Sequence, residues 1–86
     1  MSKDWNVARN QLKDALYRQE QYLKQHRENL SRFEKARDSI TEFTSDAVAD
    51  MLEQAIAEET RRVKSIETNI RDIQRDLRGK YSLAVA

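Results

Sequence analysis

Large hydrophobic residues recur along the first half of the chain in alternating steps of three and four. This spacing places them on one face of an α-helix, because two helical turns contain about seven residues. A second row, spaced by seven, lies beside the first and widens the apolar face. The first row holds Trp5, Arg9, Leu12, Leu16, Gln19, Leu23, His26, Leu30, Phe33, Arg37 and Ile40, and the second holds Ala8, Ala15, Tyr22, Asn29, Ala36 and Phe43. The pattern predicts a helix from about residue 4 to about residue 43.

The second half of the chain repeats the alternation in a different phase. Its row is Ala49, Leu52, Ile56, Glu59, Val63, Ile66, Ile70, Ile73 and Leu77. The change of phase requires a turn, which we place at about 43–46, where Thr44, Ser45 and Asp46 are good N-cap residues. A second helix should then run from about 46 to 78, and Gly79 should end it in the left-handed C′ conformation.

The two rows can be paired as an antiparallel hairpin in which the numbers of facing residues add up to 89. This pairing gives nine layers and puts the turn between Thr44 and Ser45, where the capping residues stand. The sequence therefore predicts an all-α fold: one domain over 1–86, a coiled-coil-like antiparallel two-helix hairpin. Because each helix buries only one face, we expect self-association or a partner helix to complete a four-helix bundle.

Composition excludes several classes of function. The chain has 86 residues, 36% of them charged, with one Gly, no Pro and no Cys. Such a chain is too short for two domains with a cleft between them, and it offers no disulfide, thiolate zinc site, glycine-rich phosphate loop or catalytic triad. We expect no enzyme activity, catalytic residue, cofactor, metal or small-molecule substrate. Without a signal peptide or an apolar span, a cytoplasmic protein with no membrane partner is expected.

Four polar residues interrupt the nine paired layers: Gln19, His26, Arg37 and Glu59. Polar groups at such positions commonly fix the register of paired helices. We expect His26 to be satisfied by Glu59 or Gln19, with a pH-sensitive contact as the alternative reading. Contact of these groups with a partner helix is compatible with both readings.

Several apolar residues are left without cover by the two-helix pairing. We predict a non-enzymatic interaction module, such as an adaptor, small chaperone or inhibitor, that binds a partner helix or its own copy. The predicted partner-binding residues are Tyr22, Phe43, Val48 and Met51, with Trp5, Tyr81 and Leu83 at the other end.

The tail over 79–86 has three interpretations. Tyr81 and Leu83 could fold back over Trp5, or the tail could dock on a partner as an extended peptide. Its ending, Leu83-Ala84-Val85-Ala86, also resembles the Leu-Ala-Ala ending that bacterial unfoldases read in tagged proteins, which would imply regulated turnover.

Charge is unevenly distributed although the net charge is only +1. Between Glu42 and Glu59 there are six acidic residues and no basic one, whereas Arg61 to Lys80 contains seven basic and three acidic residues. The alternative function is a nucleic-acid-associated accessory protein that works through the basic end of the hairpin. Its predicted contacts are Arg71, Arg75, Arg78 and Lys80.

Overall fold

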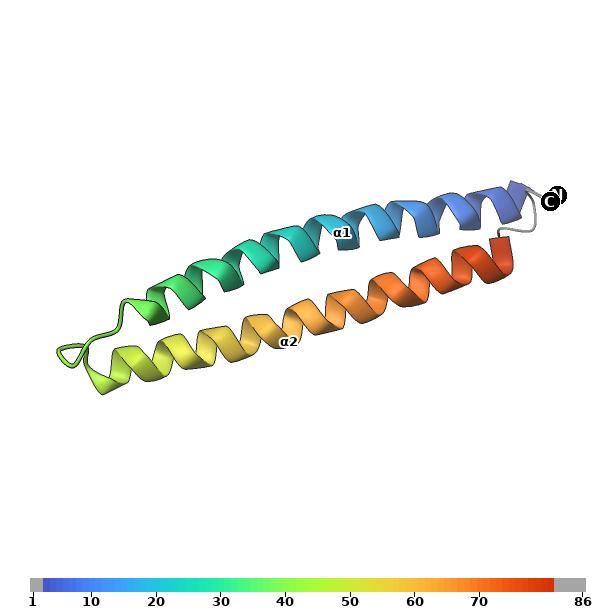
Figure 1. Ribbon diagram of the computed structural model, residues 1–86. Helices are drawn as coiled ribbons and strands as arrows, with labels where there is room; N and C mark the ends of the chain where they lie inside the picture. Colours follow the sequence, from blue (N-terminus) through green and yellow to red (C-terminus); the bar gives the residue numbers. More distant parts are fainter. Residues whose placement is uncertain (1–2, 82–86) are drawn as a thin grey trace.

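The computed structural model describes residues 3–81 and shows a long antiparallel hairpin of two helices, which confirms the predicted fold class (Figure 1). Helix α1 spans Lys3–Asp38, helix α2 spans Asp46–Asp76, and a π-helical segment, η1, continues α2 over Leu77–Tyr81. The hairpin measures 65 × 17 × 15 Å. Within residues 3–81, no helix is both long enough and apolar enough to cross a membrane.

The seam between the two helices is formed by the first predicted row of α1, which runs from Trp5 to Ile40, and the predicted row of α2, which runs from Ala49 to Leu77. Every position of these rows is partly or largely buried except Arg37, whose side chain is exposed. Over the described part of the chain only Val63 and Glu59 are largely buried, at 9% and 5% exposure. In a two-helix hairpin each helix is covered only by the other one, so the edges of the seam stay open to solvent.

Contacts across the seam follow the predicted register. Asn69 donates to the Gln19 amide oxygen at 3.3 Å, and His26 meets Glu59 at 2.7 Å. Both pairs lie within about one helical turn of the pairing in which facing residue numbers add up to 89. The predicted alignment of the two helices is therefore correct to about one turn.

The tip, which comprises residues 39–45 and the adjoining helical turns, differs from its prediction. Helix α1 ends at Asp38, about five residues before the expected end near 43. Hydroxyl groups capture the backbone donors that would continue the helix: Thr41 N–H donates to Oγ1 of Thr44 at 3.1 Å, and Phe43 N–H donates to Oγ1 of Thr41 at 3.2 Å. Phe43 consequently lies in the loop and not on the second row of α1.

Helix α2 begins with one of the three predicted caps. Ser45 has extended backbone angles (φ −66°, ψ 149°), and its hydroxyl accepts a hydrogen bond from Val48 N–H at 3.3 Å. This bond satisfies a backbone donor that the first turn of a helix leaves without a partner. The structure thus selects Ser45 over its neighbours Thr44 and Asp46.

We call the Trp5 end of α1 together with η1 the base. Here the predicted end of the second helix at Gly79 is wrong. Gly79 does not stop the helix in a left-handed conformation, because no glycine of the described residues has a positive φ. The chain stays helical through η1, and Tyr81 reaches the ring of Trp5, with centroids 5.4 Å apart. Glycine permits a left-handed cap but does not enforce one, and here the aromatic contact accompanies a right-handed continuation.

Candidate interaction surfaces

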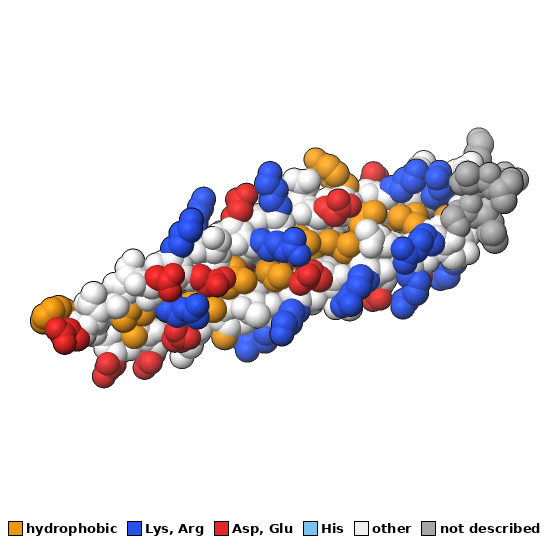
Figure 2. Space-filling view, viewed as in Figure 1, with side chains coloured by type: hydrophobic (Ala, Val, Ile, Leu, Met, Phe, Trp, Pro, Cys, Tyr) orange, Lys and Arg blue, Asp and Glu red, His pale blue; other side chains and the backbone are white. Residues whose placement is uncertain are grey.

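An apolar groove lies between the helices at the tip. Its walls are mainly hydrophobic, and it has a volume of about 410 Å³. The lining residues are Ala36, Ser39, Ile40, Thr44, Val48, Met51, Leu52 and Ala55. Val48 is 54% exposed and Met51 69% exposed, and Phe43 on the adjoining loop is 89% exposed. Figure 2 shows hydrophobic side chains at this end of the rod and along the line between the helices.

We call the side of the hairpin that contains this groove the open flank. Its apolar part consists of the second row of α1 together with three residues of α2, and the α2 row of Val48 and Ala55 continues at seven-residue spacing with Arg62 and Asn69. Its residues are Ala8, Ala15, Tyr22, Asn29 and Ala36 from α1, and Val48, Met51 and Ala55 from α2. Tyr22 is 47% exposed, and the other members of the α1 row are small or, in the case of Asn29, partly buried. The flank is therefore shallow enough for a neighbouring helix to approach closely.

The predicted partner-binding residues do not form one patch. Phe43, Val48 and Met51 gather at the tip, whereas Tyr22 lies fourteen residues before Ala36, about 21 Å away along α1. Trp5 and Tyr81 lie at the base and are both partly buried. Leu83 falls outside the described residues.

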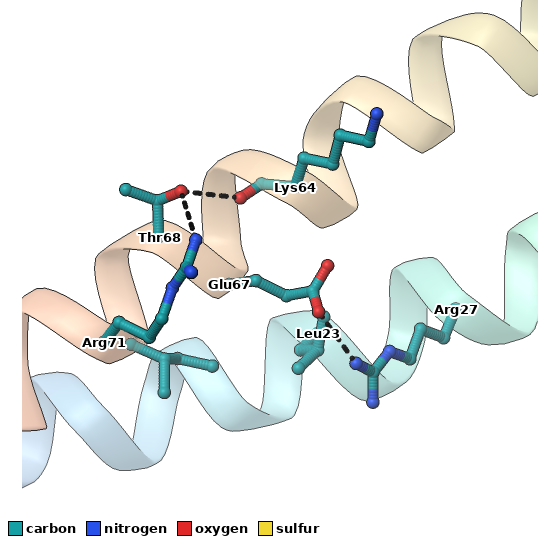
Figure 3. Close-up of a pocket in the computed structure, with 7 residues that line it drawn as sticks. Leu23, Arg27, Lys64, Glu67, Thr68 and Arg71 are labelled. Atoms are coloured by element: carbon teal, nitrogen blue, oxygen red, sulfur yellow. Dashed lines mark hydrogen bonds and ion pairs between the residues drawn. The ribbon is translucent and has the colours of Figure 1, made fainter.

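The opposite side, the charged flank, is polar. A groove there is lined by Leu23, Arg27, Lys64, Glu67, Thr68, Ile70 and Arg71. Arg27 of α1 reaches across to Glu67 of α2 at 3.2 Å, and Arg71 donates to the hydroxyl of Thr68 at 3.4 Å (Figure 3). An ion pair and a hydrogen bond within the chain thus engage Arg27, Glu67 and Arg71 on this flank.

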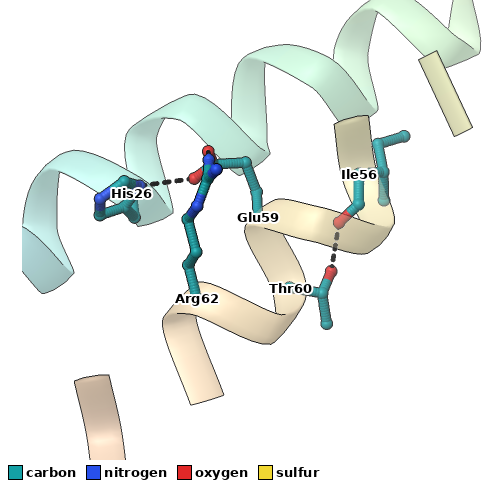
Figure 4. Close-up of polar contacts among 5 residues, drawn as sticks. All are labelled: His26, Ile56, Glu59, Thr60 and Arg62. Carbon is teal, nitrogen blue, oxygen red and sulfur yellow. Dashed lines mark hydrogen bonds and ion pairs between the residues drawn. The ribbon is translucent and has the colours of Figure 1, made fainter. Parts of the chain in front are cut away.

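A polar cluster occupies the middle of the seam. Glu59 receives hydrogen bonds from His26 Nδ1 and from Arg62, both at 2.7 Å (Figure 4). Its side chain is 7% exposed, compared with 25% for His26 and 56% for Arg62. Burial raises the pKa of Glu59, but the hydrogen bonds and positive charges of His26 and Arg62 outweigh it and hold the pKa below its ordinary value.

This cluster confirms that Glu59 satisfies His26. Gln19, the other candidate, instead accepts a hydrogen bond from Asn69. Among the described residues, no buried side-chain nitrogen or oxygen lacks a hydrogen-bond partner. The cluster is therefore complete within the chain and ties the two helices together in one register.

At the base, two aromatic rings and a cation lie together. The rings of Trp5 and Tyr81 are tilted by 52°, and the Arg9 guanidinium lies 5.9 Å from the Trp5 ring centroid. The contact of Tyr81 with Trp5 confirms that part of the fold-back prediction. Arg9, which stands four residues after Trp5 and hence on the same helix face, is an addition that its spacing could have indicated.

The basic residues proposed for nucleic acid are all exposed: Arg71, Arg75, Arg78 and Lys80. Acidic groups lie among them. Arg75 is 3.4 Å from Asp72, and Asp76 lines the same groove as Lys80 and Tyr81. The base is therefore mixed in charge, with a basic excess.

Two further hydrophobic side chains are exposed that the sequence pattern did not indicate as candidate contact residues. Val7 is 51% exposed and Tyr17 is 65% exposed. Neither belongs to the seam or to the second row of α1, so the periodic pattern gave no signal for them. Tyr17 and Tyr22 are five residues apart, about 140° around the helix, which places them on different sides of α1.

The surfaces described above hold no arrangement typical of a metal site. Within residues 3–81, no three His, Asp or Glu side chains gather where they could bind a metal ion. No protein-family model, curated protein or solved structure matches this chain.

Proposed function

We propose that this protein is a non-enzymatic interaction module, of the adaptor, small-chaperone or inhibitor type, that binds a helix through its open flank. The tip groove is the observation that carries the proposal. Large apolar side chains are exposed there beside an apolar hollow between two helices. Exposed apolar patches of this kind are typical of sites that bind other proteins.

The shape of the flank suits a helical ligand. Helices bind such grooves with apolar residues three and four positions apart, and small side chains on the receiving surface permit close approach. Ala36 and Ala55 form opposite walls of the groove, with Met51 beside them. The charged flank also has a groove, but charged and polar side chains make up most of its lining, and an ion pair between Arg27 and Glu67 lies across it.

Affinity capture with matched baits tests this function. Val48→Glu with Met51→Glu should abolish capture of proteins that the unchanged chain retains, because two carboxylates would enter an apolar contact. Tyr17→Glu is the control, since it adds a charge at an exposed aromatic residue outside the open flank. Circular dichroism checks that all three proteins remain helical. Equal capture by all three baits would overturn the proposed function.

The base supports a second candidate, a nucleic-acid-associated accessory function. Arg71, Arg75, Arg78 and Lys80 are exposed over the last three helical turns before Tyr81, which packs on Trp5 beside Arg9, and cations near aromatic rings are typical of nucleic-acid sites. This function requires binding of DNA or RNA that weakens steeply with salt. Changing Arg71, Arg75 and Arg78 to Ala should reduce that binding, whereas Val48→Glu with Met51→Glu should leave it unchanged.

A further inference from the structure

We propose that the partner of the open flank is a second copy of this chain, laid antiparallel, so that the tip of each hairpin lies against the base of the other. The inference rests on the proposed function and names its partner. The two hairpins would be related by a twofold axis that passes beside Tyr22 and would together form a four-helix bundle. Each α1 would then lie along the other α1, and each α2 along the other α2.

The order of residues along the open flank supports a twofold arrangement. In an antiparallel pairing of α1 with its copy about Tyr22, Ala8 meets Ala36, Ala15 meets Asn29, and Tyr22 meets Tyr22. A twofold interface requires such self-complementarity, because the same surface is used by both copies. Small residues face small or medium residues away from the axis, and the two exposed aromatic rings meet on it.

The distribution of charge along α2 favours the antiparallel arrangement. The stretch from Glu42 to Glu59 carries six acidic residues and no basic one, and the stretch from Arg61 to Lys80 carries seven basic residues against three acidic ones. A parallel pair would set acidic tip against acidic tip and basic base against basic base. The antiparallel pair sets opposite charges side by side, with Lys80 of one copy near Glu53 of the other.

The same arrangement brings apolar cover to Met51 at the tip. When Tyr22 lies on the axis, Tyr81 of one copy falls within about one helical turn of Met51 in the other. The base thus supplies both apolar cover and positive charge to the groove.

Single cysteines test the arrangement directly, because the natural chain contains none. Ala8→Cys and Ala36→Cys are made separately, one of them with a size tag, and are mixed under mild oxidation. Antiparallel pairing predicts a disulfide between the two variants and none within Ala36→Cys alone, because the two Ala36 positions would lie about 42 Å apart. Rapid cross-linking of Ala36→Cys with itself would show parallel pairing and overturn the proposal.

A second measurement covers the case in which no disulfide forms. The mass of the unchanged chain in solution, followed by sedimentation over a range of concentrations, should reach twice 10.2 kDa. Tyr22→Glu should weaken association by about 100-fold, since each pair carries the change twice, whereas Tyr17→Glu should change it by about twofold or less.

A mass that remains at 10.2 kDa throughout would overturn pairing with a second copy. Capture by the bait with an intact tip groove, and its loss with Val48→Glu and Met51→Glu, would then still support the proposed function. The two proposals can therefore fail separately.

Discussion

The tip and the base of this hairpin close the same pair of helices in different ways. At the tip, hydroxyl groups of Thr41 and Thr44 take backbone donors and stop α1 at Asp38, which leaves Phe43 89% exposed. At the base, the helix continues through Gly79, and Tyr81 lies against Trp5. The tip thus exposes its apolar side chains to solvent, whereas the aromatic side chains of the base pack against each other.

This difference explains how one rod can carry two complementary ends. The tip carries uncovered hydrophobic side chains, some of which Figure 2 shows at that end, whereas at the base Trp5 and Tyr81 pack on each other beside Arg9. A short hairpin that buries only one face per helix gains further burial when such ends meet.

Removal of one aromatic ring from each end should affect the free energy of unfolding very differently. Trp5→Ala should lower the free energy of unfolding by about 2 kcal/mol, because it removes the contacts of Trp5 with Tyr81 and Arg9. Phe43→Ala should change it by about 0.5 kcal/mol or less, because that side chain is 89% exposed. Urea unfolding at one fixed protein concentration measures both, and equal losses would contradict the contrast.

The buried carboxylate midway between the ends should make stability depend on pH. Because the pKa of Glu59 is lowered in the folded protein, its contribution is present above the pKa of an unfolded glutamate and is lost as pH falls through the folded value. Glu59→Gln should cost about 1.5 kcal/mol near pH 7, and the difference between the two proteins should shrink as pH drops below about 4. A difference that stays constant down to acid pH would contradict this role.

At the tip, Ser45→Ala should destabilise the chain by about 1 kcal/mol, since it removes the acceptor of Val48 N–H. Ser31→Ala is the control: Ser31 is an exposed residue within α1, where alanine is the better helix former. Thermal unfolding should show a loss for the first change and a small gain for the second.

At the base, Gly79→Ala should raise the free energy of unfolding by about 0.7 kcal/mol. Gly79 lies in right-handed helix, and an added Cβ would meet no atom within 4 Å. A left-handed cap would give the opposite sign, because alanine is strained at positive φ. A loss of stability in Gly79→Ala would therefore contradict the description of the base.

Sequence periodicity predicted those features that depend on repeated contacts. The seam, the register to within one turn and the pairing of His26 with Glu59 all follow from apolar and polar residues at three- and four-residue spacing. The Ser45 cap follows from local hydrogen-bonding chemistry just before the second row begins. The spacing signal is repeated at many positions of each helix, and the capping signal lies within a few neighbouring residues.

Features that depend on competition between alternatives were not predicted. The end of α1 is set by hydroxyls of Thr41 and Thr44 that compete with helical hydrogen bonds, and nothing in the periodicity weighs that competition. The right-handed course of the chain at Gly79 is accompanied by a contact between Tyr81 and Trp5, and no local pattern signals a contact between residues so distant in sequence. Arg62 stands three residues after Glu59 and forms an ion pair with it. Spacing alone does not show that Glu59 takes this partner.

The antiparallel pairing of two copies can be measured most directly as a distance between them. A nitroxide label on Lys35→Cys lies on the exposed surface of α1 close to the tip. Pulsed electron resonance of the labelled protein should give a separation of about 40 Å, because the two labels would lie thirteen residues to either side of the axis at Tyr22. A separation of about 20 Å, roughly two helix diameters, would place tip beside tip and contradict antiparallel pairing.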